Sequence, residues 1–386
     1  MGESDFHGRR QSGAVDASKS ASDPALGDAC SEVAVRVATD ADAIARLLER
    51  FAVRQPFEIE RDFVTAMGAP KTLVRLSPSG ERLFIGSLPL TFPADEHLAA
   101  LFPVLNRLCG SLAAAGSDVL LGAYLCTPEG GHLVRDTMHR RFVRTWLDAR
   151  APAPRPLQAR ALGIIHEHGL RVMREGGWGG LRSVRHAEVF PQWILPHLLM
   201  TVDPELRIAA ARHAAAVASF FGKAAQQVAR LDKLPLFLVH TDFQGKNLLA
   251  APPSANGVPR VCVLDAETAR LKSRAFDFYY LLITSDFGES LGDFASFEAL
   301  LAEYFDHARG LSPDEAELLP FVLQTKAAEI AAWAVHEYET ASSTQRASLR
   351  TWHARALACI QIVAENEGLI RRIGSAFAAA ENCATR

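Results

Sequence analysis

The sequence has little net charge and no long apolar run. Its 41 Lys and Arg residues nearly balance 44 Asp and Glu residues, which leaves a formal net charge of −3. Such a balance gives no general attraction to nucleic acids or to anionic membranes. No stretch of 18 apolar residues is present, so we expect no membrane-spanning helix. We therefore expect neither nucleic acid nor a membrane among the partners.

Cysteine is also sparse, and its spacing matches no known pairing pattern. The six cysteines form no CxxC pair and have no zinc-type spacing to histidine. Four of them lie in apolar runs, which is typical of buried thiols in a reducing compartment. Residues 1–32 lack the apolar segment of a signal peptide, and their Ser, Gly, Ala and Asp content predicts a disordered tail. A cytoplasmic location is the expectation.

The length of the chain, 386 residues, is enough for two lobes. A hydrophobic fraction of 49% and a charged fraction of 22% are ordinary for a globular protein. Strand and helix patterns alternate in residues 33–136, which predicts a small mixed lobe with an antiparallel sheet. Helical periodicity dominates residues 137–386 and predicts a larger, mainly helical lobe. The predicted fold class is therefore α+β with two lobes.

Apolar spacing and turn residues predict the elements of both lobes. In the small lobe we expect a helix over 40–51, a hairpin over 71–76 and 82–88, a helix over 94–108, and a second hairpin over 118–126 and 132–136. In the large lobe we expect helices over 157–174, 204–230, 294–309, 313–338 and 345–380. The arginines between residues 140 and 150 are interpreted as one exposed face of a short helix, with anion binding as the alternative.

Two polar loops follow short apolar runs and concentrate the chemistry. Residues 237–239 lead into a loop that contains His240, Asp242 and Asn247, and residues 261–264 lead to Asp265. Two such strands can pair and bring their loops together. A carboxylate can accept the proton of an attacking hydroxyl, and Asn and Asp oxygens are ligands that suit Mg²⁺.

The spacing of these residues is typical of phosphoryl transfer. In kinases a loop Asp and an Asn stand five residues apart, and a metal-binding Asp follows them. Asp242, Asn247 and Asp265 reproduce that spacing and order. The alternative is that the loop residues are only turn formers between strands. That interpretation does not explain why a second acid ends the next strand.

The segments HTDFQGKNLL and VLDAETARLKSRAFDFYYLL resemble the aminoglycoside phosphotransferase/choline kinase family of small-molecule kinases. The match covers residues 237–282. It implies a bilobal protein-kinase-like fold, Mg²⁺ as cofactor, and ATP or GTP as phosphoryl donor. It also implies Asp242 as catalytic base, Asn247 and Asp265 as magnesium ligands, and His240 as a support of the loop.

Two further acids follow in the matched segment. Asp277 matches a later Asp that is mainly structural in the family, and Glu267 matches an acid of less certain role.

The small lobe departs from the family pattern. The family places a basic residue on the second strand of the first hairpin, near Ile85 or Gly86 in this chain, and no base is there. Strand alternation puts Lys71 and Arg75 on one face, and Lys71 is nearer the turn that would cover the phosphates. We expect Lys71 to face the cleft and Glu96 to hold the place of the family's helix Glu. The alternatives are an exposed strand residue and an acid favoured by the helix dipole.

The missing base leaves a second function class open, a pseudokinase-like nucleotide-binding or regulatory module. The retained loop residues argue against it. A protein kinase is less favoured, because no A-P-E motif follows and no long activation segment separates Asp265 from Asp277.

The acceptor is expected to be a small molecule with a hydroxyl group. Acidic residues are frequent between residues 281 and 320, which suits an aminoglycoside or another cationic or sugar-like acceptor. Asp286 and Glu289 are the candidates nearest the motif, and Trp178 in a Gly-rich loop is a candidate stacking residue. The alternatives are solvated helix faces and a buried anchoring Trp. Oligomeric state is left open.

Overall fold

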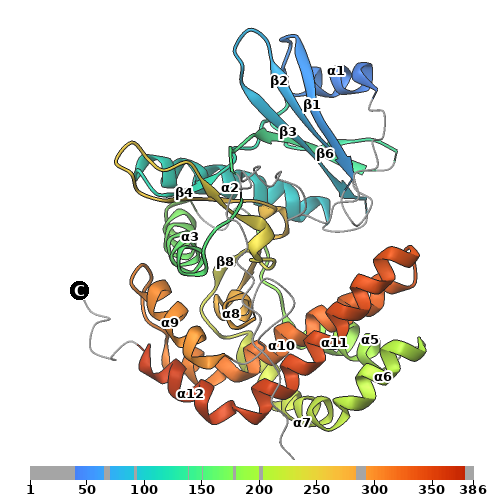
Figure 1. The fold of residues 1–386 in the computed structure, drawn as a ribbon, viewed down its shortest axis with the longest axis vertical. Coiled ribbons are helices and arrows are strands. Elements are labelled where there is room, and N and C mark those ends of the chain that lie inside the picture. Colours follow the sequence, from blue (N-terminus) through green and yellow to red (C-terminus); the bar gives the residue numbers. More distant parts are fainter. Residues whose placement is uncertain are drawn as a thin grey trace, which may run out of the picture.

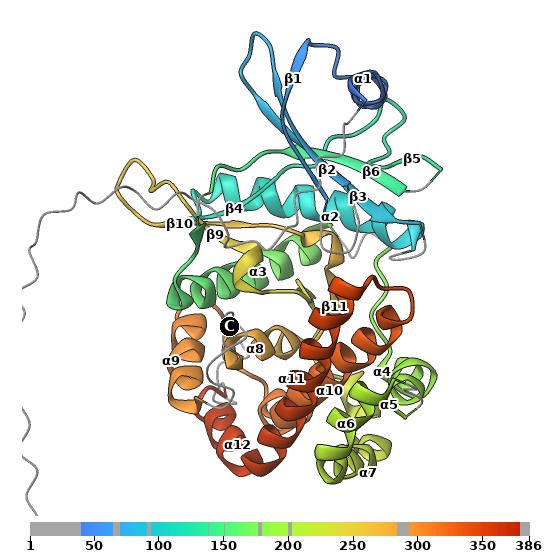
Figure 2. The ribbon, with the colours of Figure 1, turned by 45° about the vertical axis from the view of Figure 1, so that its right-hand side comes forward.

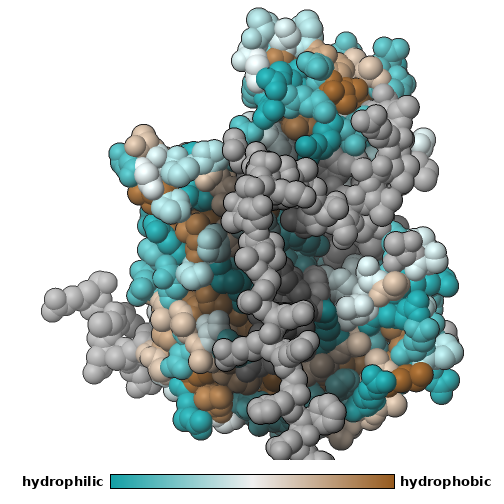
Figure 3. Space-filling view, in the orientation of Figure 1, coloured by the Kyte–Doolittle hydropathy of each residue, from teal (hydrophilic) through white to brown (hydrophobic). Residues whose placement is uncertain are grey.

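The computed structural model describes residues 40–64, 70–90, 94–137, 139–149, 151–176, 180–199, 203–283 and 293–378. The tail predicted over residues 1–32 lies outside them. Two lobes are stacked, with the sheet of the small lobe above and the helices of the large lobe below (Figure 1). The predicted α+β class with two lobes is confirmed. Figure 3 shows hydrophilic residues over much of the visible described surface of both lobes.

Five strands form the antiparallel sheet of the small lobe, in the order β1-β2-β3-β6-β5. They are β1 (Phe57–Val64), β2 (Pro70–Leu76), β3 (Arg82–Pro89), β5 (Val134–Arg135) and β6 (His139–Thr145). Strands β2 and β3 confirm the first predicted hairpin. Helix α1 (Ala41–Arg50) begins after Asp40, which caps it, and packs through Ile44 and Leu48 on one face of the sheet.

The Arg-rich stretch is a strand, so the predicted helix there is wrong. Arg140 and Arg144 lie on β6, which pairs with β3, and both side chains are buried. Arg140 pairs with Asp95 at 2.6 Å. The charge of these arginines had suggested an exposed surface. An Arg side chain can be buried when it has an acidic partner, and for Arg140 this partner, Asp95, is distant in the sequence. The sheet thus continues past the boundary expected between residues 136 and 137.

The second predicted hairpin does not form. Strand β4 (Val119–Leu121) instead pairs in parallel with β10 (Arg260–Val263), in a sheet of order β4-β10-β9-β7. The other strands of that sheet are β7 (Ala151–Pro152) and β9 (Leu248–Ala251). A parallel partner from the other half of the chain leaves no local sequence signal, which is why the hairpin was the simpler interpretation.

The large lobe is built mainly from helices. They are α3 (Arg155–Gly176), α4 (His186–Val189), α5 (Leu195–Leu199), α6 (Pro204–Arg212), α7 (Ala214–Leu231), α8 (Ala275–Leu282), α9 (Phe294–Phe305), α10 (Pro313–Tyr338), α11 (Ser343–Glu365) and α12 (Glu367–Ala376), with a π-helical turn η1 (Phe190–Ile194) before α5. The predicted helices are confirmed, except that 204–230 breaks at His213 and 345–380 breaks at Asn366. Helix α10 runs through this lobe beside α11 (Figure 2).

Two described helices, α2 (Asp95–Ala114) and α10, are long and apolar enough to cross a membrane by length and composition alone. The absence of long apolar runs had predicted none. In α10 89% of the most apolar window is buried inside the protein, and in α2 39%. The burial of α10 is that of a core helix, whose apolar residues pack against neighbouring helices.

Candidate active site

Two short strand pairs bring the polar loops together. Strand β9, directly after the first loop, pairs with β10, and the Leu264 amide donates to the Asn247 carbonyl at 2.9 Å. Asn247 therefore lies across from the residue that precedes Asp265. Strand β8 (Phe237–Val239), before the loop, pairs with β11 (Arg270–Lys272) and not with β10. The loops converge as predicted, although through different strand partners.

Asp242 lies in the first loop with its carboxylate held by amide groups. The Asn247 Nδ2 donates to Asp242 Oδ2 at 2.9 Å and to the Asp242 carbonyl at 2.9 Å, and Gln244 donates to Oδ1. The Asp242 side chain is 29% exposed, whereas Asn247 is buried. Because the nitrogen of Asn247 serves Asp242, its side-chain oxygen is the atom that remains for another partner.

Asp277 holds the backbone of the first loop through hydrogen bonds to two amides. It is fully buried, and it accepts hydrogen bonds from the amides of His240 at 2.8 Å and Thr241 at 3.0 Å. His166 lies 3.2 Å from the same carboxylate and is bonded in turn to the Tyr304 hydroxyl. Burial opposes ionisation, but the hydrogen bond with His166 and the proximity of His240 hold the pKa of Asp277 below its ordinary value. These contacts are those of a structural residue.

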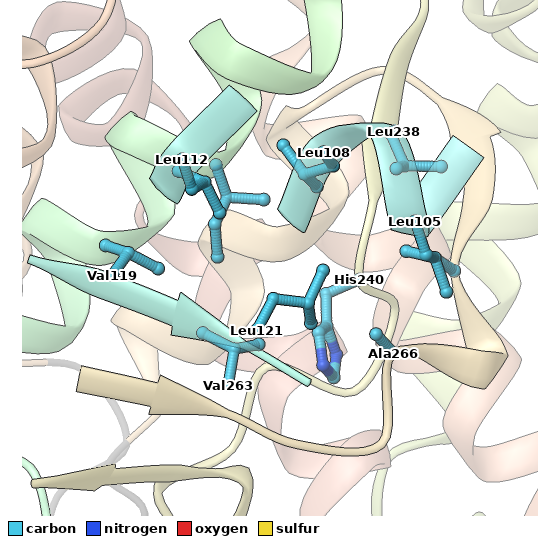
Figure 4. Close-up of a pocket in the computed structure, with 11 residues that line it drawn as sticks. Leu105, Leu108, Leu112, Val119, Leu121, Leu238, His240, Val263 and Ala266 are labelled. Atoms are coloured by element: carbon cyan, nitrogen blue, oxygen red, sulfur yellow. The ribbon is translucent and has the colours of Figure 1, made fainter. Parts of the chain in front are cut away.

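His240 supports the loop and faces away from solvent. Its Nε2 lies 2.7 Å from the Leu264 carbonyl, so the ring links the two loops. The ring borders a small apolar cavity of about 20 Å³, lined by Leu105, Leu108 and Leu121 among others (Figure 4). An apolar wall of this kind offers no place for a charged substrate.

Thr241 has a backbone conformation that is unfavourable for its side chain. Its φ of 68° is in the left-handed region, which costs a β-branched residue on the order of 1–3 kcal/mol. The Thr241 carbonyl accepts hydrogen bonds from the Tyr280 hydroxyl and the Lys326 ammonium, both at 2.7 Å. The Thr241 hydroxyl donates to the Thr268 carbonyl at 3.0 Å. Burial lowers the pKa of Lys326. The contacts on Thr241 therefore hold the loop in a conformation that its sequence disfavours.

Lys71 reaches Asp265 from the small lobe. Its Nζ lies 3.4 Å from Asp265 Oδ1, and the two side chains are 16% and 38% exposed. Burial disfavours the charged form of Asp265, but the nearby charges of Lys71 and Arg144 hold its pKa below the ordinary value. Arg75 instead pairs with Glu60 at the sheet surface. The direction of Lys71 agrees with the expectation, and its role stays a prediction.

The place of the missing base is filled by apolar atoms. A Cβ added to Gly86 would lie 2.1 Å from the ring of Phe142, so no side chain fits there. Ile85 is buried in the cluster under α1 and points away from the cleft. Glu96 is exposed and makes no hydrogen bond or ion pair with any described residue; its neighbour Asp95 binds Arg140. Glu96 therefore has no basic partner on a strand among the described residues.

Sequence reasoning missed Tyr124 and Arg144, which both contact Glu267. The Tyr124 hydroxyl donates to Glu267 Oε1 at 2.9 Å, and Arg144 Nε lies 3.9 Å from the same oxygen. Burial and the Asp265 carboxylate raise the pKa of Glu267. The alternation of Arg140, Phe142 and Arg144 along β6 was the available signal, since it places these residues on one face of a strand.

Three candidate acceptor residues, Trp178, Asp286 and Glu289, lie outside the described residues.

The donor set fits a magnesium site completed by a nucleotide. Among the described residues no group of three or more His, Cys, Asp or Glu side chains could hold a metal ion. Asn247 and Asp265 offer two oxygen ligands on adjacent loops. Mg²⁺ in phosphoryl-transfer sites is typically held by one or two protein groups, with water and substrate phosphates at the other positions. These two residues suit that coordination.

Comparisons with known proteins connect this fold to small-molecule kinases. No protein-family model and no curated protein matches the chain. An amicoumacin kinase in complex with AMP-PNP, Ca²⁺ and Ami has a TM-score of 0.56 at 13% identity, covering 83% of this chain and 96% of its own. A spectinomycin phosphotransferase with ADP and spectinomycin has a TM-score of 0.55 at 11% identity, covering 86% and 99%. An ethanolamine kinase of Plasmodium vivax has a TM-score of 0.50 at 10% identity, covering 80% and 83%. The chain shares the two-lobed fold of these kinases.

Proposed function

We propose that this protein is a phosphotransferase that moves the γ-phosphoryl group of ATP or GTP to a hydroxyl group of a small molecule. The observation that carries the proposal is the convergence of Asp242, Asn247 and Asp265 on two adjoining loops, with Lys71 directed at them from the other lobe. Catalysis of phosphoryl transfer consists largely of positioning and charge stabilisation, which such a constellation supplies.

Each residue has a role that follows from its surroundings. Asp242 is partly exposed and ionisable, so it orients the acceptor hydroxyl and accepts its proton. Asn247 and Asp265 would hold Mg²⁺, which when bound neutralises phosphate charge. Lys71 contacts the α- and β-phosphates when it exchanges the Asp265 carboxylate for phosphate oxygens. Both contacts are charge-assisted hydrogen bonds of the ammonium group.

The acceptor class follows from the acidic residues after the motif and from the acceptors of kinases with the same fold. The three kinases of the same fold are named for amicoumacin, spectinomycin and ethanolamine. Acidic residues follow the motif in this chain, and Asp286 and Glu289 are the proposed contacts for a cationic group, with Trp178 as a stacking residue. We therefore propose an amino-alcohol, aminoglycoside or sugar-like acceptor. A cytoplasmic location, where nucleoside triphosphates are available, belongs to the same proposal.

A transfer screen tests the function directly. Purified protein is incubated with Mg²⁺ and ATP or GTP against a panel of aminoglycosides, amino alcohols and sugars, and phosphorylated product is detected by ³¹P NMR and mass spectrometry. We expect transfer to at least one hydroxyl-bearing amine, and much slower transfer by the Asp242→Asn variant. Absence of nucleotide binding would contradict the proposal. Nucleotide binding without transfer to any acceptor would favour a non-catalytic binding module.

Lys71→Ala should weaken activity far more than Arg75→Ala. Lys71 is mostly buried against Asp265, whereas Arg75 is 47% exposed and pairs with Glu60. Loss of a charge-assisted contact to phosphate should lower kcat/KM for the nucleotide by about tenfold or more in Lys71→Ala. Loss of an exposed ion pair should change it by about twofold or less in Arg75→Ala. Steady-state kinetics with varied ATP measures both variants. Equal losses for the two would remove Lys71 from the phosphate site.

Lys326→Met should lower kcat by about tenfold with little change in nucleotide KM. The variant keeps the length of the buried side chain but removes one of two donors to the Thr241 carbonyl, next to Asp242. Glu329 keeps its bond to Lys272 at 2.7 Å, so no buried carboxylate is left alone. Lys223→Met, at a surface ion pair of α7, is the control. A kcat equal to that of the control would show that the contact does not position the loop.

A further inference from the structure

Glu267 faces the small lobe although it belongs to the metal-binding loop. It lies in the short 3-10 helix η3 (Ala266–Thr268), two residues after Asp265, and is 3% exposed. Its Oε1 accepts the Tyr124 hydroxyl hydrogen bond and lies 3.9 Å from Arg144 Nε. Because its described partners all come from the small lobe, the carboxylate joins the two lobes at the point where Asp265 is placed.

Tyr124 is held in place by contacts of its backbone and ring, in addition to its hydroxyl contact with Glu267. Its amide donates to Asn106 Oδ1 at 2.7 Å, and Asn106 Nδ2 donates back to the Tyr124 carbonyl at 2.9 Å. Its ring stacks on Phe102 with centroids 4.6 Å apart. Asn106 and Phe102 both belong to α2. The position of the hydroxyl is therefore set by the contacts of Tyr124 with α2.

Arg144 supplies a buried positive charge from the sheet itself. Its guanidinium lies 4.4 Å from the centroid of the Phe84 ring and its side chain is 4% exposed. Lys71 Nζ lies 5.7 Å from the same ring. The metal-binding loop thus meets two cations of the small lobe, Lys71 at Asp265 and Arg144 at Glu267. Leaving the buried Glu267 carboxylate without such a partner is costly, which favours retention of its contact with Arg144.

We propose that Tyr124 and Arg144 are positioning residues that hold the metal-binding loop through Glu267. The inference rests on the proposed function and deepens it. Glu267 acts here as an anchor and not as a metal ligand, since its side chain is buried between Tyr124 and Arg144. The anchor also restrains Asp265, whose φ of 54° is in the left-handed region. Loss of the anchor frees the loop to relax and misplaces the carboxylate that would bind Mg²⁺.

Tyr124→Phe tests this with minimal change, because the ring and its stacking on Phe102 remain. Isothermal titration calorimetry measures affinity for ATP with Mg²⁺ and for ATP with EDTA. We expect the affinity with Mg²⁺ to fall by about tenfold, the effect of losing a hydrogen bond to a charged group, and the affinity with EDTA to change by less than about twofold. Tyr338→Phe is the control, since it removes the same hydroxyl group from a tyrosine at the C-terminal end of α10. A purely structural role would lower the melting temperature and weaken both affinities alike.

Three outcomes would overturn the inference. One is a Tyr124→Phe variant that binds Mg²⁺ and ATP as tightly as the Tyr338→Phe control. Another is a Glu267→Gln variant that loses all Mg²⁺ dependence while Tyr124→Phe keeps it, which would make Glu267 a direct ligand. Failure of the wild-type protein to bind Mg²⁺ and nucleotide would overturn the proposed function and the inference with it. The first outcome, with normal wild-type binding, would overturn the inference alone.

Discussion

Asp242→Asn should lower kcat by roughly 10²–10⁴ while fold and nucleotide affinity stay close to those of the wild type. The range is that of a positioned general base. The substitution keeps the size of the side chain and removes its charge and its proton affinity. Asn247 continues to donate to the remaining oxygen, and Gln244 can turn its amide to accept from the new NH₂ group. Steady-state kinetics and nucleotide titration separate the loss of chemistry from a loss of binding.

The control for this variant is Asp42→Asn, an exposed acid in the first turn of α1. It changes net charge by the same amount in the other lobe and should leave kcat unaltered. Near-normal turnover of Asp242→Asn would remove this carboxylate from the mechanism. Loss of nucleotide affinity equal to the loss of kcat would assign Asp242 to binding and not to proton transfer.

Asp265→Asn should abolish the dependence of nucleotide binding on Mg²⁺. Asp265 is the only charged member of the two-residue oxygen donor set, and a hard cation binds a carboxylate more strongly than an amide. Asn tolerates the left-handed φ of 54° better than Ala does, so the loop keeps its shape. Titration calorimetry with ATP across a range of Mg²⁺ concentrations measures the effect.

Asn247→Ala provides the comparison within the same site. It removes a neutral ligand, so the shift in the Mg²⁺ requirement should be smaller than that of Asp265→Asn. Nucleotide affinity that responds neither to Mg²⁺ nor to either substitution would contradict the magnesium site. That result would favour a binding module without transfer.

The loops were predictable because their signal is local. His240, Asp242 and Asn247 lie within eight residues, and their spacing alone imposes which side chains share a turn. The direction of the Lys71 side chain was predictable for a related reason, because strand alternation decides which face of the strand it occupies. Helices of the large lobe followed from apolar spacing, although the ends at His213 and Asn366 did not.

The contacts between lobes were not predictable in the same way. Arg144 meets Glu267 across 123 residues of sequence, by subtraction of their positions, and Tyr124 meets it across 143. No spacing rule reaches that far, and a run of arginines is more often exposed than buried. For Glu96 the sequence instead suggested a contact that is not seen. Its place in the helix predicted a basic partner, and no described residue provides one.

The Phe142 ring against Gly86 has a consequence for any attempt to place a base at that position. A lysine introduced at position 86 by one substitution would have its Cβ 2.1 Å from the ring, so the change needs a smaller residue at 142. Shrinking Phe142 alone would leave a void in the packed interior beside Phe84 and Phe102, at a cost of about 3–5 kcal/mol for a Phe→Ala change. Each of the two single substitutions is therefore expected to destabilise the small lobe. A base at position 86 would need a smaller residue at 142 in the same variant.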